Sequence, residues 1–262
     1  MLTRIISGAV IIIFVAALVC FHLIVDFPYL LIGILSLAAA TATFELTKNA
    51  KLVGNNILVW ISSVWAFLQF AALCTYPSLS IYLSIVFVLA VVVLSLVLYG
   101  KVTNNEIMSS IAIPIIIGFA FYCLFALLER GLLYLLLVIN FSAVNDCGAY
   151  FVGVTLGKHK LCEKISPKKT IEGAVGGIAL SLIVTVVLCF IFGITDKILP
   201  LLVMTPVLCI IGILGDLFAS TIKRNADIKD YGTLIPGHGG ITDRFDSILL
   251  IAPVFVLLLN IF

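Results

Sequence analysis

The chain is divided into about nine apolar segments, most of them long enough to cross a membrane as a helix. They cover approximately residues 5–25, 28–47, 57–76, 79–99, 107–128, 132–151, 173–195, 198–219 and 247–262. Charged residues make up only 11% of the chain, whereas about a quarter of a soluble domain is charged. The pattern therefore predicts an all-α polytopic membrane protein with about nine transmembrane helices.

Other classes fit the sequence less well. Long apolar runs without strict alternation argue against a membrane β-barrel. The first run, from Ile5 to Val25, is too long for a signal peptide, and no small-residue cleavage site follows it, so we expect it to be the first span. The 7 cysteines form no CxxC or CxxxC pair, which gives little support to a zinc site or a disulfide framework.

The distribution of basic residues predicts the topology. With nine spans and a cytoplasmic N-terminus, only Arg130 and Lys197 of the 15 Lys and Arg residues lie outside. An excess of bases in cytoplasmic loops is the usual rule for membrane proteins. We therefore expect an integral protein of the cytoplasmic (inner) membrane with its C-terminus outside. Its hydrophilic loops 152–172 and 220–246, together with any site that they form, then face the cytoplasm.

No linker or repeat divides the chain, so we expect a single membrane domain over residues 1–262. Residues 1–131 are interpreted as scaffold spans and 132–262 as catalytic spans. The last span is short, because a helix from Ile248 to Phe262 rises only about 22 Å. Either the membrane thins there, or the helix begins earlier and draws Arg244 and Asp246 to a depth where ionisable groups usually line a cavity.

A polar island from Asp216 to Ser247 interrupts the apolar pattern. On a helix, Asp216, Ser220, Lys223 and Asp227 share one face. The acids could hold a cation while the base binds phosphate oxygens. An ion-paired helix end at the membrane surface explains this segment alone equally well.

A glycine-rich loop and two acids complete the island. The loop from Pro236 to Gly240 offers backbone N–H groups to an anion. Asp243 and Asp246 follow at spacing i, i+3, and paired carboxylates suit Mg²⁺. Paired acids alone are often solvated helix caps, but their conjunction with the preceding acid–base helix favours a site. No Walker A loop, dinucleotide fingerprint or HExxH motif occurs.

A third polar segment runs from Asn145 to Gly177. It contains Asp146 and a run of lysines that includes Lys168 and Lys169. Ser166-Pro167 and Glu172 predict the entry to the next helix. The lysines can be a positive-inside loop or can attract a polyphosphate and anionic headgroups. Glu45 can pair with Lys48 or line a pocket, and the sequence does not decide between the two.

The motifs STIKR and KDYGTLIPGHGGITDRFD, within residues 220–246, resemble the signature of the phosphatidate cytidylyltransferases, also called CDP-diacylglycerol synthases. The blocks DCGAYFVG, ISPKKTIEGAVGG and GDLFAS are similar to that family as well. The resemblance covers about residues 146–247, and the first half is similar only in being apolar and multispanning. Cys147 stands where Ala or Thr is more usual in the family.

The resemblance implies that CTP and phosphatidic acid react to give CDP-diacylglycerol and pyrophosphate, a step of phospholipid biosynthesis. It also implies that Asp216, Asp243 and Asp246 hold Mg²⁺, with K⁺ as a candidate second ion. The candidate catalytic residues are Asp216, Lys223, Asp243 and Asp246. The candidate substrate-binding residues are Asp146, Lys168, Lys169, Ser220, Arg224, Lys229, His238, Gly239, Gly240 and Arg244. The expected partners are CTP, phosphatidic acid, the lipid bilayer and, from the resemblance alone, a second copy of the chain, but no nucleic acid.

Two other functions stay open. A CTP-dependent polyprenol kinase has related membrane architecture but would yield a phosphorylated alcohol and CDP. The full HGGITDRFD run with the SPKKT block favours the cytidylyltransferase. A transporter would need paired broken helices in two symmetric halves, whereas acids and chain breakers here crowd into the second half.

Overall fold

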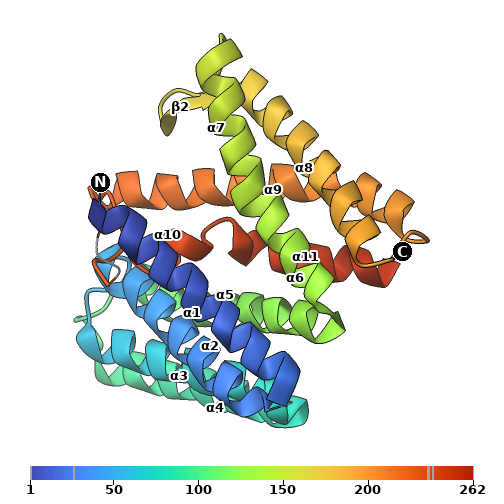
Figure 1. Ribbon diagram of the computed structural model, residues 1–262. Coiled ribbons are helices and arrows are strands. Elements are labelled where there is room, and N and C mark those ends of the chain that lie inside the picture. Colours follow the sequence, from blue (N-terminus) through green and yellow to red (C-terminus); the bar gives the residue numbers. More distant parts are fainter. Residues whose placement is uncertain (1, 26, 235–236, 238, 262) are drawn as a thin grey trace. The chain divides into compact units, whose positions relative to one another are not determined.

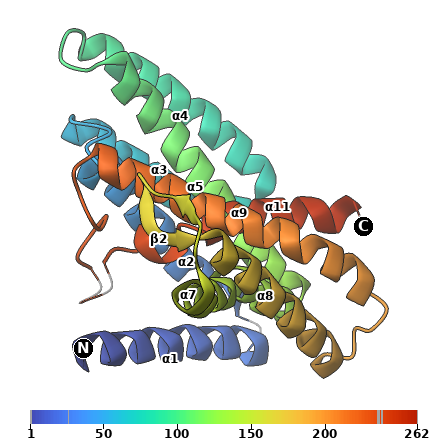
Figure 2. The ribbon, with the colours of Figure 1, turned by 90° about the horizontal axis from the view of Figure 1, so that it is seen from above.

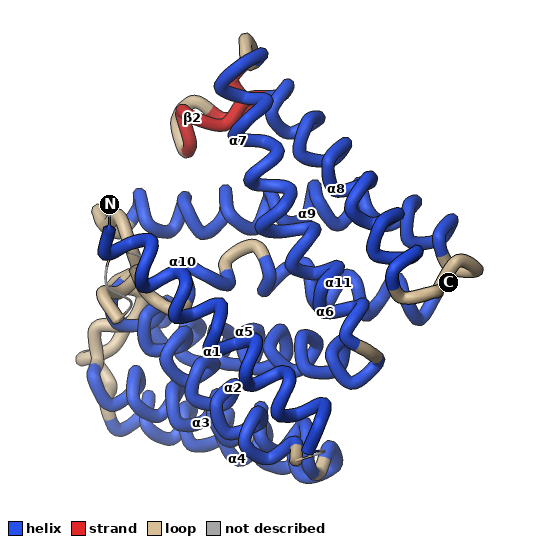
Figure 3. The backbone as a smooth tube through the Cα atoms, in the orientation of Figure 1, coloured by secondary structure: helices blue, strands red, loops and turns tan. Residues whose placement is uncertain are grey.

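The computed structural model describes residues 2–25, 27–234, 237 and 239–261. For residues 2–12 and 14 it describes the backbone alone. The chain is almost wholly helical, with one short hairpin (Figure 3). Its first helices are α1 (Leu2–Val25), α2 (Pro28–Phe44), the π-helical turn η1 (Glu45–Asn49), α3 (Asn56–Thr75), α4 (Pro77–Val97) and α5 (Asn104–Arg130). There follow α6 (Leu132–Ile139), the π-helical turn η2 (Asn140–Val144), α7 (Asn145–Leu156), β1 (Lys160–Cys162), β2 (Ser166–Thr170), α8 (Ile171–Ile191), α9 (Ile198–Asn225), α10 (Thr242–Phe245) and α11 (Ile248–Ile261).

Within the described residues, 7 helices are long and apolar enough to cross a membrane. They are Pro28–Asn49, Asn56–Thr75, Pro77–Val97, Asn104–Arg130, Leu132–Leu156, Ile171–Ile191 and Ile198–Asn225. Shorter apolar helices occupy Val15–Val25 and Ile248–Ile261. The helices match the predicted segments to within a few residues in most places, which confirms a polytopic all-α protein. The short last helix begins only at Ile248, so Arg244 and Asp246 precede it.

The polar segments are more ordered than the sequence analysis predicted. Helix α7 continues to Leu156 and helix α9 to Asn225, which shortens both expected loops. The block Ser166–Thr170 is a strand of an antiparallel hairpin and not a helix entry, and α8 begins at Ile171 with Thr170 as its N-cap. The predicted place of Asp227 on the face of α9 is wrong, because the helix has ended and Asp227 has a φ of 56°.

The chain divides into two compact units. The N-terminal unit comprises Met1–Tyr122 and Ala226–Arg244, and the C-terminal unit comprises Cys123–Asn225 and Phe245–Phe262. The division between scaffold and catalytic spans was placed at residue 131 in the sequence analysis. The structure moves the polar segment that follows α9 into the unit of the early helices.

Each unit has its own apolar core. In the N-terminal unit, α3 packs against α2 and α4, and the rings of Trp65 and Phe87 stack with centroids 4.3 Å apart. In the C-terminal unit, α9 packs against α8 and α11, and the buried rings of Phe141 and Phe255 meet edge to face at 5.4 Å. Large apolar side chains that stay exposed, such as those of α4, are what a lipid-facing surface requires.

A buried asparagine accounts for one polar interruption of the sixth apolar segment. Asn140 in η2 donates from Nδ2 to the carbonyl of Ser181 at 3.0 Å and to Oγ1 of Thr185 at 3.1 Å. Thr185 in turn contacts Thr205 of α9 at 3.1 Å. Hydrogen bonds of this kind join helices where water is excluded, so Asn140 serves the assembly of the C-terminal unit.

Helices α7 and α8 pack against each other (Figures 1 and 2), and glycines of both helices lie at their contact. A Cβ atom added to Gly148 would lie 3.0 Å from Cα of Gly177. One added to Gly173 would lie 2.6 Å from the carbonyl oxygen of Ala149. Small residues let helix backbones approach closely in membranes. The glycines of the GAYFVG and EGAVGG blocks thus fix the angle and depth at which α7 meets α8.

Replacing Gly173 by Ala should lower the thermal stability of the purified protein, because the new methyl group has no room against α7. The matched control is Gly33→Ala in α2, where an added Cβ meets nothing within 4 Å. There the higher helix propensity of Ala should leave stability unchanged or raise it by up to about 1 kcal/mol. Equal melting temperatures for the two variants would show that the glycine contact between α7 and α8 is not tightly packed.

Candidate active site

Acids and lysines from three elements meet in the C-terminal unit. Lys169 of β2 places its Nζ 2.5 Å from Oδ2 of Asp216 in α9. This Nζ is buried and makes no hydrogen bond within the described chain, so the contact is an ion pair without hydrogen-bond geometry. The charges of both residues act on Asp146 of α7, which is itself exposed. The structure therefore joins the polar segment from Asn145 to Gly177 and the start of the polar island at one place.

Asp246 belongs to the same group of charges. It lies between α10 and α11, and Asp216, Lys223 and Asp146 all act on it electrostatically. Burial raises the pKa of the Asp246 carboxyl, and the Asp216 carboxylate raises it further. We call Asp146, Lys169, Asp216, Lys223 and Asp246 the acid–lysine cluster.

A glycine lets the segment of Asp246 approach α9 closely. A Cβ on Gly215 would lie 2.9 Å from the carbonyl oxygen of Asp246 and 3.1 Å from Cα of Ser247. Gly215 directly precedes Asp216, so the position that carries one acid also admits the backbone of the other. The GDLFAS block thus supplies one acid, Asp216, and at Gly215 the space that the backbone of Asp246 needs.

The hairpin determines which lysine enters the cluster. Successive residues of a strand point to opposite faces. Lys168 is exposed, whereas its neighbour Lys169 is partly buried and paired with Asp216. The lysine run of the sequence therefore separates into one lysine in the cluster and others, such as Lys164, in solvent.

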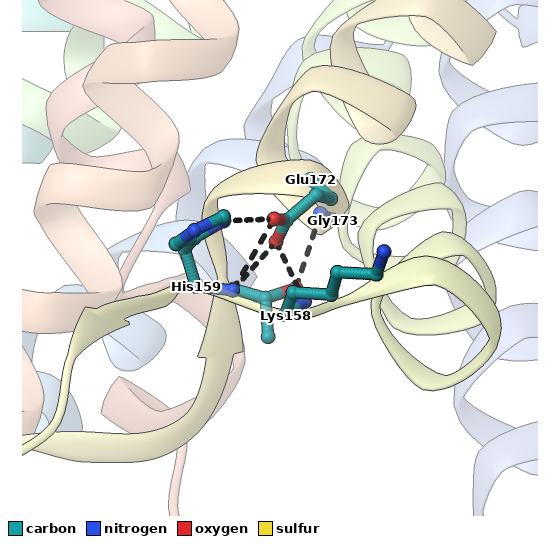
Figure 4. Close-up of polar contacts among 5 residues, drawn as sticks. Lys158, His159, Glu172 and Gly173 are labelled. Atoms are coloured by element: carbon teal, nitrogen blue, oxygen red, sulfur yellow. Dashed lines mark hydrogen bonds and ion pairs between the residues drawn. The ribbon is translucent and has the colours of Figure 1, made fainter.

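Glu172 binds the residues that lead into this hairpin, Lys158 and His159 (Figure 4). Its carboxylate accepts backbone N–H groups of Lys158 and His159, each at 3.1 Å to Oε2. Its Oε1 also lies 2.6 Å from Nδ1 of His159. Next to it, Oγ1 of Thr170 accepts the N–H of Gly173 at 3.1 Å. The entry to the hairpin is in this way tied to the first turn of α8.

Replacing Glu172 by Ala should loosen the hairpin and lower activity about 10-fold, because two backbone donors and the His159 ring lose their acceptor. His159→Ala should have a smaller effect, since the Glu172 carboxylate keeps its two backbone donors and the imidazole is 75% exposed. Limited proteolysis between residues 157 and 170 measures the loosening. Equal cleavage of the wild type and Glu172→Ala would contradict this role.

Asp243 lies in the N-terminal unit and holds the glycine loop together. Its Oδ2 accepts the N–H of Tyr231 at 2.7 Å and the N–H of Gly240 at 3.0 Å. The side chain of Asp243 is buried, while Arg244 beside it is exposed. The N–H of Gly240 is thus already bound within the protein, and is not open to an anion as the loop sequence suggested.

The structure groups the predicted site residues by unit. The C-terminal unit contains Asp146, Lys168, Lys169, Asp216, Ser220, Lys223, Arg224 and Asp246. The N-terminal unit contains Lys229, Gly239, Gly240, Asp243 and Arg244. The prediction for His238 falls outside the described residues. Over those described, no three Asp, Glu, His or Cys side chains are gathered as a ready-made metal site.

Two acids that organise these segments, Glu172 and Glu45, are not among the predicted site residues. The sequence predicts Glu172 only as a helix-start signal, and Glu45 as either a partner of Lys48 or an acid that lines a pocket. Glu45 is 3% exposed and accepts two backbone N–H groups of the segment that precedes Asp243. Its only signal in the sequence was an acid at the end of a long apolar run.

Comparison with known proteins shows the family to which this chain is similar. The model of the family described as "Cytidylyltransferase family" matches residues 2–262. The "Phosphatidate cytidylyltransferase" of Bacillus subtilis is 34% identical over 231 residues, which cover 85% of this chain and 86% of that protein. That of Staphylococcus haemolyticus is 45% identical over 143 residues, 55% of each chain, and that of Staphylococcus saprophyticus is 43% identical over the same length. The alignments thus span about half the length of the staphylococcal proteins and most of the Bacillus protein.

Proposed function

This chain belongs to the cytidylyltransferase family, and we propose that it is a phosphatidate cytidylyltransferase, which transfers CMP from CTP to phosphatidic acid. The observation that carries the proposal is the acid–lysine cluster, in which Lys169 of the SPKKT strand reaches Asp216 of α9. The names of the Bacillus and staphylococcal relatives support the same activity.

In the proposed reaction, a phosphate oxygen of phosphatidic acid attacks the α-phosphorus of CTP in line. A new P–O–P bond forms to the lipid, and the bond from the α-phosphorus to the bridging oxygen breaks as pyrophosphate leaves. A phosphate monoester is already a competent nucleophile near neutral pH, so no strong general base is required. The work of the protein is to position two polyanions and to balance their charge.

Lysines of the cluster suit that task. Lys169 sits between protein carboxylates and can exchange its Asp216 partner for a phosphate oxygen of CTP. Lys223 is on the same helix, two turns after Asp216, and Arg224 follows it at an exposed position. Each supplies a cation where negative charge accumulates on the phosphates.

The acids of the cluster fit a divalent cation. Asp216 acts electrostatically on Asp246, and both side chains are partly buried; Mg²⁺ binds to carboxylate oxygens along with water and substrate phosphates. When bound, Mg²⁺ would neutralise and orient the phosphates of CTP. Asp243 stays in the proposed ligand set, although its Oδ2 already accepts two backbone N–H groups.

The location of the enzyme follows from the same residues. We infer nine spans, a cytoplasmic N-terminus and a site that opens to the cytoplasmic face of the inner membrane. The excess of bases in the segments after α7 and α9 supports this orientation. A lipid headgroup in that leaflet can there meet a water-soluble nucleotide. A homodimer remains an expectation from the family.

The test is pyrophosphate release by the purified protein with Mg²⁺, CTP and one lipid acceptor at a time. Phosphatidic acid should support release, whereas a polyprenol should support neither pyrophosphate nor CDP formation. Formation of CDP and a phosphorylated alcohol would assign the polyprenol kinase instead. No reaction with either acceptor, under conditions in which the Bacillus relative is active, would reject the proposal.

A further inference from the structure

Glu45 is a buried acid that pairs with no base among the described residues. It begins the π-helical turn η1 at the end of α2, and its side chain is 3% exposed. The neighbouring Lys48 donates to Oδ1 of Asn56 instead. A buried carboxylate needs partners, because its desolvation is costly. The partners of Glu45 come from a segment almost two hundred residues later.

Both oxygens of Glu45 accept backbone N–H groups of the segment that carries Asp243. The N–H of Ile241 lies 3.0 Å from Oε1 and the N–H of Thr242 lies 2.8 Å from Oε2. These N–H groups open the short helix α10, which carries Asp243 and Arg244. Oγ1 of Thr242 adds a bond of 3.3 Å to the carbonyl of Ala42 in α2.

The loop is shaped around this carboxylate. A Cβ on Gly232 would lie 2.6 Å from Oε1 of Glu45, and a Cβ on Gly240 would collide with the same carboxylate. Nδ2 of Asn49, one turn later in η1, donates to the carbonyl of Tyr231 at 2.6 Å. Two glycines of the segment are therefore required because Glu45 occupies the space beside their backbones.

Glu45 and Asp243 together accept four N–H groups of the segment from Tyr231 to Thr242. Asp243 accepts those of Tyr231 and Gly240, and Glu45 accepts the next two along the chain. Charge-assisted bonds of this kind are stronger than bonds between neutral groups. The wider π-helical turn at Glu45 is a feature that often occurs at functional sites.

On these contacts, we propose that Glu45 is a positioning residue of the active site. Its charged carboxylate holds the turn from Gly240 to Thr242 so that Asp243 and Arg244 keep the orientation that the reaction needs. The effect of Glu45 on catalysis rests on the proposed function. Its hydrogen bonds to the turn from Gly240 to Thr242 do not depend on that function.

The test uses the purified full-length protein in lipid nanodiscs and the variant Glu45→Gln. An amide retains one acceptor oxygen but turns an NH₂ group toward the other backbone N–H. We expect kcat to fall about 10- to 100-fold. We also expect hydrogen exchange of a peptide spanning residues 239–245 to quicken about 10-fold or more.

The matched control is Thr47→Val in the same π-helical turn. Thr47 is fully buried, and within the described part of the chain its hydroxyl bonds only to the carbonyls of Thr43 and Phe44. This variant should lower the melting temperature comparably, yet leave loop exchange and kcat near the wild-type values. It separates general loss of stability from loss of loop geometry.

Each outcome decides the proposal. A kcat for Glu45→Gln equal to that of Thr47→Val would overturn it, and so would a loss of kcat with unchanged exchange at residues 239–245. If the wild-type protein makes no CDP-diacylglycerol, the proposed function fails. The hydrogen-exchange rates of residues 239–245 alone then show whether Glu45 stabilises this segment.

Discussion

Replacing Asp216 by Asn is expected to lower kcat about 10²- to 10³-fold while folded protein still accumulates in the membrane. Asn is nearly isosteric with Asp, so the packing of α9 beside Gly215 should survive. What is lost is the charge that faces Lys169 at 2.5 Å and acts on Asp146 and Asp246. The loss should appear in the rate of pyrophosphate release at saturating CTP and phosphatidic acid.

Thr221→Val is the matched control for this prediction. Thr221 lies on the same helix, and its hydroxyl bonds to the carbonyl of Leu217 in that helix at 2.9 Å. This variant should keep kcat within about twofold of the wild type. If Asp216→Asn were as active as Thr221→Val, the acid–lysine cluster would not be the catalytic centre.

Replacing Lys169 by Met should lower both activity and stability. The carboxylate of Asp216 would stay beside Asp146 and Asp246 without its cation. Breaking a fully buried ion pair costs about 3–5 kcal/mol. The side chains of Lys169 and Asp216 are 24% and 25% exposed, so solvent screening reduces the expected loss to about 1–3 kcal/mol. We expect kcat to fall about 10²-fold, because a cation near the phosphates is lost as well.

Two further variants test the origin of this loss. Lys164→Met removes a lysine from an exposed position of the same hairpin and should change neither property appreciably. The double variant Lys169→Met with Asp216→Asn should recover part of the lost melting temperature, since no uncompensated charge remains at the pair. Its activity should stay low. Additive losses of stability would show that the two side chains do not interact.

The helices were predictable because lipid constrains the sequence strongly. A span in hydrocarbon must satisfy its backbone internally and present apolar side chains, so segments such as 57–76 and 198–219 are recognisable from composition alone. The acids Asp146 and Asp216 and the lysine Lys169 were also recognisable, because charge is scarce in this chain. Their approach to one another across α7, α9 and the hairpin was not.

Contacts between distant residues explain the remaining differences. The bond from Glu45 to Thr242 joins positions 197 residues apart, and no local pattern encodes it. The SPKKT block forms a strand because it pairs with Lys160–Cys162, whereas Ser-Pro followed by an acid locally resembles a helix start. Of the N–H groups expected to be free in the glycine loop, that of Gly240 is taken by Asp243, and Glu45 accepts that of Ile241 directly after the loop, since buried donors seldom stay unpaired.

Several glycines of the family-like blocks acquire a physical role from the structure. Gly148, Gly173 and Gly177 let α7 and α8 touch, and Gly215 admits the backbone of Asp246. Gly232 and Gly240 make room for Glu45. These residues shape the surroundings of the acids and lysines, and none of them needs to contact a substrate.

The central claim is that the chain transfers the nucleotidyl group of CTP, and not its terminal phosphate, to a lipid phosphate. The most direct measurement supplies the purified protein with Mg²⁺, phosphatidic acid and CTP labelled at either the α- or the γ-phosphorus. The account predicts that α-label enters the organic-soluble lipid and γ-label leaves as pyrophosphate, with both signals strongly reduced in Asp216→Asn. Lipid that carries γ-label, or α-label that leaves only as CDP, would contradict it.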